Sequence, residues 1–188
     1  MMLLKILRVA ASIIILPVTV LVLVPWAILR ITNDVCYAWA CTFPLSIVRM
    51  VVAVLLIGAG LALFLWTNGL FIGRGKGTLA PWDPAQTLII EGPYRYMRNP
   101  MIAGVLLVLL GEGVLFTSIP ILVWFFIFLG LNLVYLPLSE ERGMRARFGE
   151  DFDLYRENVP AWIPREEPWD GFLRPSGDPS TGQGDESH

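Results

Sequence analysis

Arg95 and Arg98 stand three positions apart in EGPYRYMRNPMIAG, residues 91–104, where polar residues directly border a long apolar run. Side chains at this spacing point to similar sides of a turn or helix. Pro100 restricts Asn99 to extended geometry and opens the apolar helix that follows. The pattern predicts polar chemistry held at a membrane surface. Basic and aromatic residues before a spanning helix also serve as ordinary interfacial anchors, and that alternative stands beside the first.

Histidine and cysteine are too scarce for several common kinds of catalytic site. The chain has one histidine, His188, which follows a polar, acidic stretch, and two cysteines, Cys36 and Cys41. A metal centre of His and Cys ligands, a Ser-His pair and a Cys-His pair all need a histidine within the domain. Metalloenzymes of this type and triad hydrolases are therefore excluded.

The elements that must position the polar stretch are apolar. Hydrophobic residues make up 55% of the 188, charged residues only 16%, and the mean hydropathy is +0.63. This composition predicts an all-α integral membrane protein with about four transmembrane helices. The first span is favoured over a signal peptide, because it is longer than a signal core and lacks a clear cleavage site. The expected spans are residues 9–29, 47–66, 101–116 and 121–138.

Only a few residues around Ser118 and Pro120 separate the last two spans, so these spans must form a tight antiparallel hairpin. The hairpin returns the chain to the side of the membrane on which residues 91–100 lie. There the adjacent carboxylates Glu140 and Glu141 close the last apolar run. We therefore expect this acidic pair to face the NPM segment, residues 99–101, although about forty residues separate them.

Charge placement predicts the orientation of the chain. Of the fourteen Lys and Arg residues, all but Arg30 and Arg49 fall on one side of the four-span arrangement. By the positive-inside rule, both termini and the polar stretch are cytosolic. Residues 140–158 have the apolar spacing of an amphipathic helix, which completes a membrane domain of residues 1–165. The acidic residues 166–188, rich in Pro and Gly, are expected to form a disordered tail.

Some polar side chains inside the expected spans have two interpretations. Glu112 is a functional candidate as an intramembrane carboxylate, but it also lies near enough to a helix end to reach the far interface. Asn132 and Tyr135, three apart, either line a pocket or bond between helices. The glycines of GRGKG, residues 73–77, fit no phosphate-loop pattern.

Two motifs, with a helical hairpin between them, resemble one family of membrane enzymes. The first is GPYRYMRNPM, residues 92–101, and the second runs from the Glu140 pair through FGEDFDLYRENVPAWIPR, residues 148–165. Together they resemble the isoprenylcysteine carboxyl methyltransferase and phospholipid methyltransferase superfamily, in its bacterial members with an RNPM sequence. The resemblance covers roughly residues 73–165.

The resemblance implies an enzyme that transfers a methyl group from S-adenosylmethionine at the cytosolic face of a membrane. The implied acceptor is lipidic or small and apolar: an isoprenylcysteine-like carboxylate, a phospholipid amine or a thiol. Membrane lipids are the expected partners, and neither a metal nor nucleic acid is needed. Arg98 and Glu141 are the implied catalytic residues. The implied cofactor-binding residues are Tyr94, Arg95, Arg98, Asn99, Pro100, Met101, Glu140 and Glu141.

One position departs from the family pattern. Many members have His where this chain has Asn99, and asparagine does not titrate near neutral pH. The departure argues against a proton acceptor at this position and against inferring an isoprenylcysteine substrate. It also supports an alternative, a non-catalytic membrane scaffold or small-molecule-binding protein that keeps the fold. The retained Arg98, Pro100, Glu140 and Glu141 favour the enzyme, expected in a bacterial inner membrane as a multi-pass protein.

Overall fold

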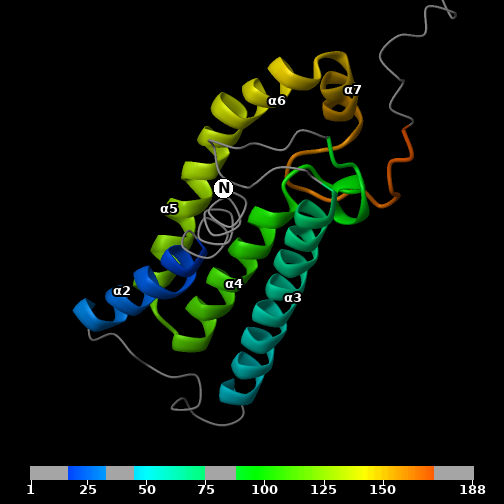
Figure 1. The fold of residues 1–188 in the computed structure, drawn as a ribbon. Coiled ribbons are helices and arrows are strands. Elements are labelled where there is room, and N and C mark those ends of the chain that lie inside the picture. Colours follow the sequence, from blue (N-terminus) through cyan, green and yellow to red (C-terminus); the bar gives the residue numbers. More distant parts are fainter. Residues whose placement is uncertain (1–16, 33–44, 75–87, 172–188) are drawn as a thin grey trace, which may run out of the picture.

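The computed structural model describes residues 17–32, 45–74 and 88–171, and all regular secondary structure within these ranges is helical (Figure 1). A π-helical turn, Thr19–Leu23, leads into α2. The helices are α2 (Val24–Thr32), α3 (Leu45–Arg74), α4 (Pro100–Phe116), α5 (Ile119–Tyr135), α6 (Glu141–Phe148) and α7 (Glu150–Asn158). The first part of the expected span 9–29, both cysteines, residues 75–77 of the GRGKG loop and residues 172–188 of the expected tail lie outside the described residues.

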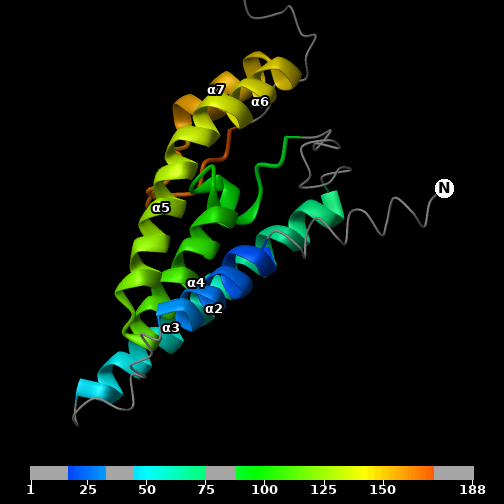
Figure 2. The same ribbon diagram turned by 90° about the vertical axis from the view of Figure 1, so that its left-hand side faces the viewer.

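Helices α3 and α4 form the closest helix pair in the described structure and run antiparallel, side by side (Figures 1 and 2). Small residues allow this approach. A Cβ atom added to Gly60 of α3 would lie 2.6 Å from the Gly104 carbonyl oxygen of α4. Gly111 faces the Ala53 and Ile57 region of α3 in the same way. Helix α3 is longer than the expected span 47–66, because the helix continues past the apolar run to Arg74.

The predicted hairpin is present between α4 and α5. Thr117 adopts left-handed geometry at φ 51°, and its backbone N–H bonds the last turn of α4. The Ser118 N–H donates to the Gly113 carbonyl at 3.1 Å, and Pro120 sits in the first turn of α5. These contacts close the end of α4 and start α5 in the opposite direction, so the chain returns towards residues 92–99.

The amphipathic helix expected at residues 140–158 is divided in two. Helix α5 first continues through a π-helical turn, Leu136–Glu140, which contains Pro137. Because proline lacks the N–H that an α-helix needs at this point, the wider turn absorbs the missing bond. Gly149 then separates α6 from α7 with φ 52° and ψ −126°, a conformation that favours glycine. Sequence periodicity does not detect this break, because apolar spacing continues across it.

Two apolar clusters lie at different places along the molecule. The first joins the π-helical turn Thr19–Leu23 to α4, α3 and α5, and the Trp124 indole N–H donates to the Val20 carbonyl at 3.3 Å. The second lies beside α6 and α7 and buries Leu88, Phe152, Tyr155 and Val159, with Met144, Phe148 and Trp169 packed around them. The apolar side of α6 and α7 is thus covered by the protein's own chain.

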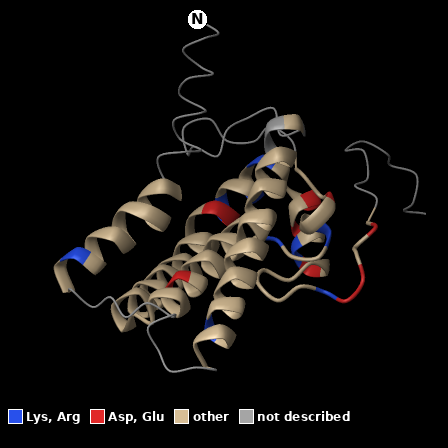
Figure 3. Ribbon diagram, turned by 90° about the horizontal axis from the view of Figure 1, so that it is seen from below, with Lys and Arg blue, Asp and Glu red and all other residues tan. Residues whose placement is uncertain are grey.

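Two helices are long and apolar enough to cross a membrane: Leu45–Leu70 of α3, and Ile119–Phe148, which joins α5 to α6. The other apolar helices, Thr19–Thr32 and Pro100–Phe116, are shorter, and their role as spans stays a prediction. Many large apolar side chains on α3 and α5 are exposed, as a lipid environment would allow. Charged residues gather mainly around α6, α7 and the segments beside them (Figure 3).

Candidate active site

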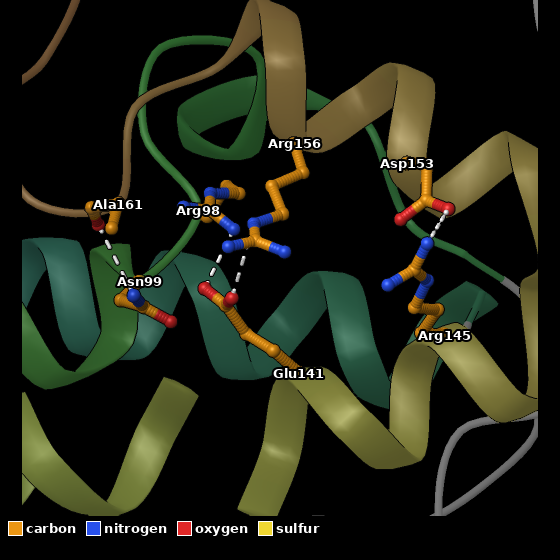
Figure 4. Close-up of polar contacts among 7 residues, drawn as sticks. All are labelled: Arg98, Asn99, Glu141, Arg145, Asp153, Arg156 and Ala161. Carbon is orange, nitrogen blue, oxygen red and sulfur yellow. Dashed lines mark hydrogen bonds and ion pairs between the residues drawn. The ribbon is translucent and has the colours of Figure 1, made fainter. Parts of the chain in front are cut away.

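An ion pair between Arg98 and Glu141 joins the two sequence motifs. A terminal guanidinium nitrogen of Arg98 donates to Glu141 Oε1 at 2.6 Å, and the two side chains are only 13% and 16% exposed (Figure 4). Arg98 precedes α4 and Glu141 begins α6, so the α4–α5 hairpin brings them together as the sequence predicts. Charge-assisted bonds of this kind are strong when they are shielded from water.

Arg156, on α7, contacts the other oxygen of the same carboxylate. Its Nε lies 3.4 Å from Glu141 Oε2, and its side chain is 51% exposed (Figure 4). Glu141 therefore lies between two guanidinium groups from segments on either side of it in sequence. Sequence analysis assigned no role to Arg156, because its place on the polar side of an amphipathic pattern gives no signal of a partner.

The segment before α4 is held by the C-terminal segment, residues 159–170. The backbone N–H groups of Arg98 and Asn99 donate to the carbonyls of Pro160 and Ala161 at 2.9 and 3.2 Å. Farther along, the Arg165 N–H donates to the Tyr96 carbonyl at 3.0 Å. The VPxWIPR part of the second motif thus supplies backbone acceptors and donors to the first motif, a role that its residue types alone do not indicate.

The two arginines of the first motif point to different partners. Arg98 bonds Glu141, whereas Arg95 pairs with Asp170 and donates from Nε to the Trp169 carbonyl at 3.2 Å. The Trp169 N–H returns a bond to the Arg95 carbonyl at 3.0 Å. Arg95 is therefore engaged with residues of the expected tail, of which residues 166–171 are described and rest against the site.

Tyr94 is buried and linked to α7 through its backbone. The Tyr155 hydroxyl donates to the Tyr94 carbonyl at 2.7 Å, and both tyrosines belong to the core. Burial raises the pKa of Tyr94, and Tyr155 and Glu140 raise it further. Burial also raises the pKa of Tyr155, against the positive charge of Arg98. Both phenols are consequently neutral well above physiological pH.

The remaining predicted residues lie close in sequence to this ion pair. Asn99 donates from Nδ2 to the Ala161 carbonyl at 3.2 Å, and Pro100 is buried at the first position of α4, with Met101 next to it. Glu140 ends the π-helical turn and is exposed. Neither a hydrogen bond nor an ion pair joins the Glu140 carboxylate to the described residues, so the two adjacent glutamates differ in their engagement.

A family model for phospholipid methyltransferases matches residues 48–151, more than half of the chain. The chain belongs to the phospholipid methyltransferase family. Membership implies methyltransferase activity at the level of the family and agrees with a membrane location. No match is found among curated proteins or among solved structures. The matched residues include Arg98 and Glu141, whereas Arg156 and residues 159–170 lie beyond them.

Proposed function

We propose that this protein is an S-adenosylmethionine-dependent methyltransferase that acts at the cytosolic face of a membrane on a lipidic or small apolar acceptor. One observation carries the proposal: the shielded Arg98–Glu141 pair joins two motifs 43 residues apart inside the region that the family model matches. The four-span topology, with both termini cytosolic, belongs to the same proposal. It rests on the apolar helices and on the charge distribution along the chain.

The residues present fit the polar end of S-adenosylmethionine. Arg98 Nε is buried, and within the described residues it has no hydrogen-bond partner, which leaves one N–H donor for a carboxylate. Glu140, next to Glu141 in sequence, has an exposed carboxylate that suits an ammonium group or ribose hydroxyls. When bound, the donor supplies an activated methyl group on a sulfonium. The chain's own tasks are then to align the acceptor and to exclude water.

Within this proposal, the two glutamates have different roles. Both oxygens of Glu141 hold arginines, which suits a residue that orients Arg98. The Glu140 carboxylate forms no ion pair with an arginine among the described residues. An amine acceptor must lose a proton before methyl transfer, and Glu140 is then the better placed proton acceptor of the pair.

The acceptor is proposed to approach from the lipid phase. Leu131, Val134 and Leu138 present exposed apolar side chains along the part of the helix that ends at Glu140. A hydrocarbon chain lying against this surface brings a polar head to the level of the glutamates. This route suits phospholipid amines, prenylated cysteines and apolar thiols alike.

The test begins with donor binding. Calorimetry of the solubilised full chain with S-adenosylmethionine should show saturable binding that Arg98→Ala and Glu141→Ala abolish. Arg145→Ala is the matched control, because it breaks a different ion pair, with Asp153, on neighbouring helices. Folded wild-type protein that binds no donor, in lipid as well as in detergent, would refute the proposal.

Methyl transfer is tested separately with labelled donor. Vesicles containing phosphatidylethanolamine, a prenylated cysteine analogue or a long-chain thiol are offered in parallel, and the labelled product identifies the acceptor class. Donor binding without transfer to any of the three would favour the non-catalytic small-molecule-binding alternative.

A further inference from the structure

The Glu141 carboxylate contacts two arginines, Arg98 and Arg156. Sequence analysis did not single out Arg156. We infer that Arg156 is a positioning residue for the Arg98–Glu141 pair. By holding Oε2, it fixes the plane of the carboxylate so that Oε1 stays on Arg98. This inference rests on the proposed function and names a further residue on which that function depends.

The burial of the three side chains supports this arrangement. Arg98 and Glu141 are largely shielded, whereas Arg156 is half-exposed and contacts the pair from α7 (Figure 4). A glutamate with only one oxygen engaged can rotate about its side-chain bonds and exchange its partner for water. The second guanidinium contact restricts that rotation, so the guanidinium group of Arg98 keeps its orientation.

The backbone around Arg156 is anchored independently of the ion pair. Tyr155, its neighbour, is buried and donates to the Tyr94 carbonyl at 2.7 Å, and Phe152 and Val159 are buried on either side. The backbone at Arg156 is therefore fixed by its neighbours, and the contact of its side chain with Glu141 follows from the packing of α7 against the first motif. Helix α7, itself part of the second motif, thereby contacts the first motif through Tyr155 and Glu141 through Arg156.

A second ion pair provides the control for this inference. Arg145 of α6 lies 3.0 Å from Asp153 of α7, with side chains 64% and 34% exposed (Figure 4). It has the same charge types and also links α7 to α6, but among the described residues no ion pair or side-chain hydrogen bond joins it to Arg98 or Glu141. If both pairs were only surface ion pairs, each would contribute little to stability and nothing to donor binding.

The experiment compares Arg156→Gln with Arg145→Gln in the full chain, using calorimetric binding of S-adenosylmethionine and thermal unfolding. We expect Arg156→Gln to weaken donor binding by about fivefold or more, and Arg145→Gln to leave it unchanged. The unfolding temperatures of the two variants should fall equally and slightly. Where transfer is measurable, the KM for the donor should rise more than kcat falls.

Two further substitutions of Arg156, one that keeps the charge and one that reverses it, provide a second test. Arg156→Lys should restore part of the affinity, because it keeps the charge but not the planar geometry, and Arg156→Glu should weaken binding most. Equal donor affinities for Arg156→Gln and Arg145→Gln would overturn this inference while the proposed function stands. Failure of the wild-type chain to bind the donor would overturn both.

Discussion

The α3–α4 pair and the polar end of the molecule are held together by different physical means. Helices α3 and α4 meet through glycine, with backbone atoms of Gly60 and Gly104 in close approach. At the polar end, residues 92–99 and 159–170 are joined by backbone hydrogen bonds and an ion pair.

The difference arises because the two regions satisfy their backbone hydrogen-bonding groups in different ways. A helix bonds its own backbone groups, so two helices need only compatible shapes, and small residues provide them. The segment at residues 92–99 makes only a short 3-10 turn, Gly92–Arg95, so its other backbone groups require partners from elsewhere. The C-terminal segment provides several of them. The stability of the α3–α4 pair should therefore depend on side-chain volume at its glycines. The stability of the polar end should depend on single hydrogen bonds and ion pairs.

The sharpest test of the α3–α4 pair is Gly60→Ala. Its added Cβ would lie 2.6 Å from the Gly104 carbonyl oxygen and 2.9 Å from the Val108 nitrogen, both backbone atoms. We expect a loss of about 3 kcal/mol in the free energy of unfolding, measured by thermal unfolding in detergent. Gly58→Ala, in the same helix with nothing within 4 Å of its added Cβ, is the control and should be neutral or slightly stabilising. Equal effects of the two substitutions would contradict the close approach.

High pH should weaken the polar end selectively. Burial raises the pKa of both Tyr94 and Tyr155, so the unfolded tyrosines ionise near pH 10 while the folded ones stay neutral. Their stabilising contribution is therefore complete below about pH 10 and is lost as the pH rises above it, by up to about 1.4 kcal/mol per pH unit for each. Unfolding measured from pH 7 to 11 checks this. A stability that stays level to pH 11 would contradict the burial of these phenols.

Tyr155→Phe removes one hydrogen bond from the polar end while keeping the ring. Because the hydroxyl donates to the Tyr94 carbonyl at 2.7 Å in a buried setting, we expect a loss of about 1 to 2 kcal/mol in the free energy of unfolding. The same variant should also reduce the loss of stability above pH 10. Tyr135→Phe, at a half-exposed tyrosine of α5, is the control and should change little. Identical values for both would mean that the bond contributes nothing.

Asn99→Ala should have the smallest effect. Its Nδ2 bond to the Ala161 carbonyl is lost, but its backbone N–H donates to the same oxygen and remains. We expect a loss of about 0.5 to 1 kcal/mol in the free energy of unfolding, measured by the same unfolding assay. Asn158→Ala, which removes an exposed side-chain bond within α7, serves for comparison. A loss as large as that of Gly60→Ala would assign Asn99 a structural role far beyond one bond.

Much of the helical framework is predictable from the sequence. The expected spans 101–116 and 121–138 correspond closely to α4 and α5, and the short turn at Ser118 does reverse the chain. The division of residues 140–158 at Gly149 is not predicted, because a periodic apolar pattern continues through a single glycine with positive φ. Membrane crossing by four helices stays a prediction, since two of them have the length and composition that crossing requires.

The candidate site is predictable in part. The sequence led to Arg98 and Glu141 through their motifs and through the hairpin that joins them. It named both Arg95 and Arg98 as cofactor-binding residues and only Arg98 as catalytic; in the structure Arg95 bonds the C-terminal segment and Arg98 bonds Glu141. It also placed both Glu140 and Glu141 at the cofactor and named only Glu141 as catalytic; in the structure only Glu141 forms ion pairs with arginines among the described residues.

The sequence by itself determined the apolar helices, the hairpin and the two motifs, because local periodicity and short connections constrain these directly. Only the tertiary structure decided which guanidinium meets which carboxylate, and that Arg156 and residues 159–170 support the site. These pairings join segments separated by tens of residues. They depend on distances and directions that composition and spacing do not contain.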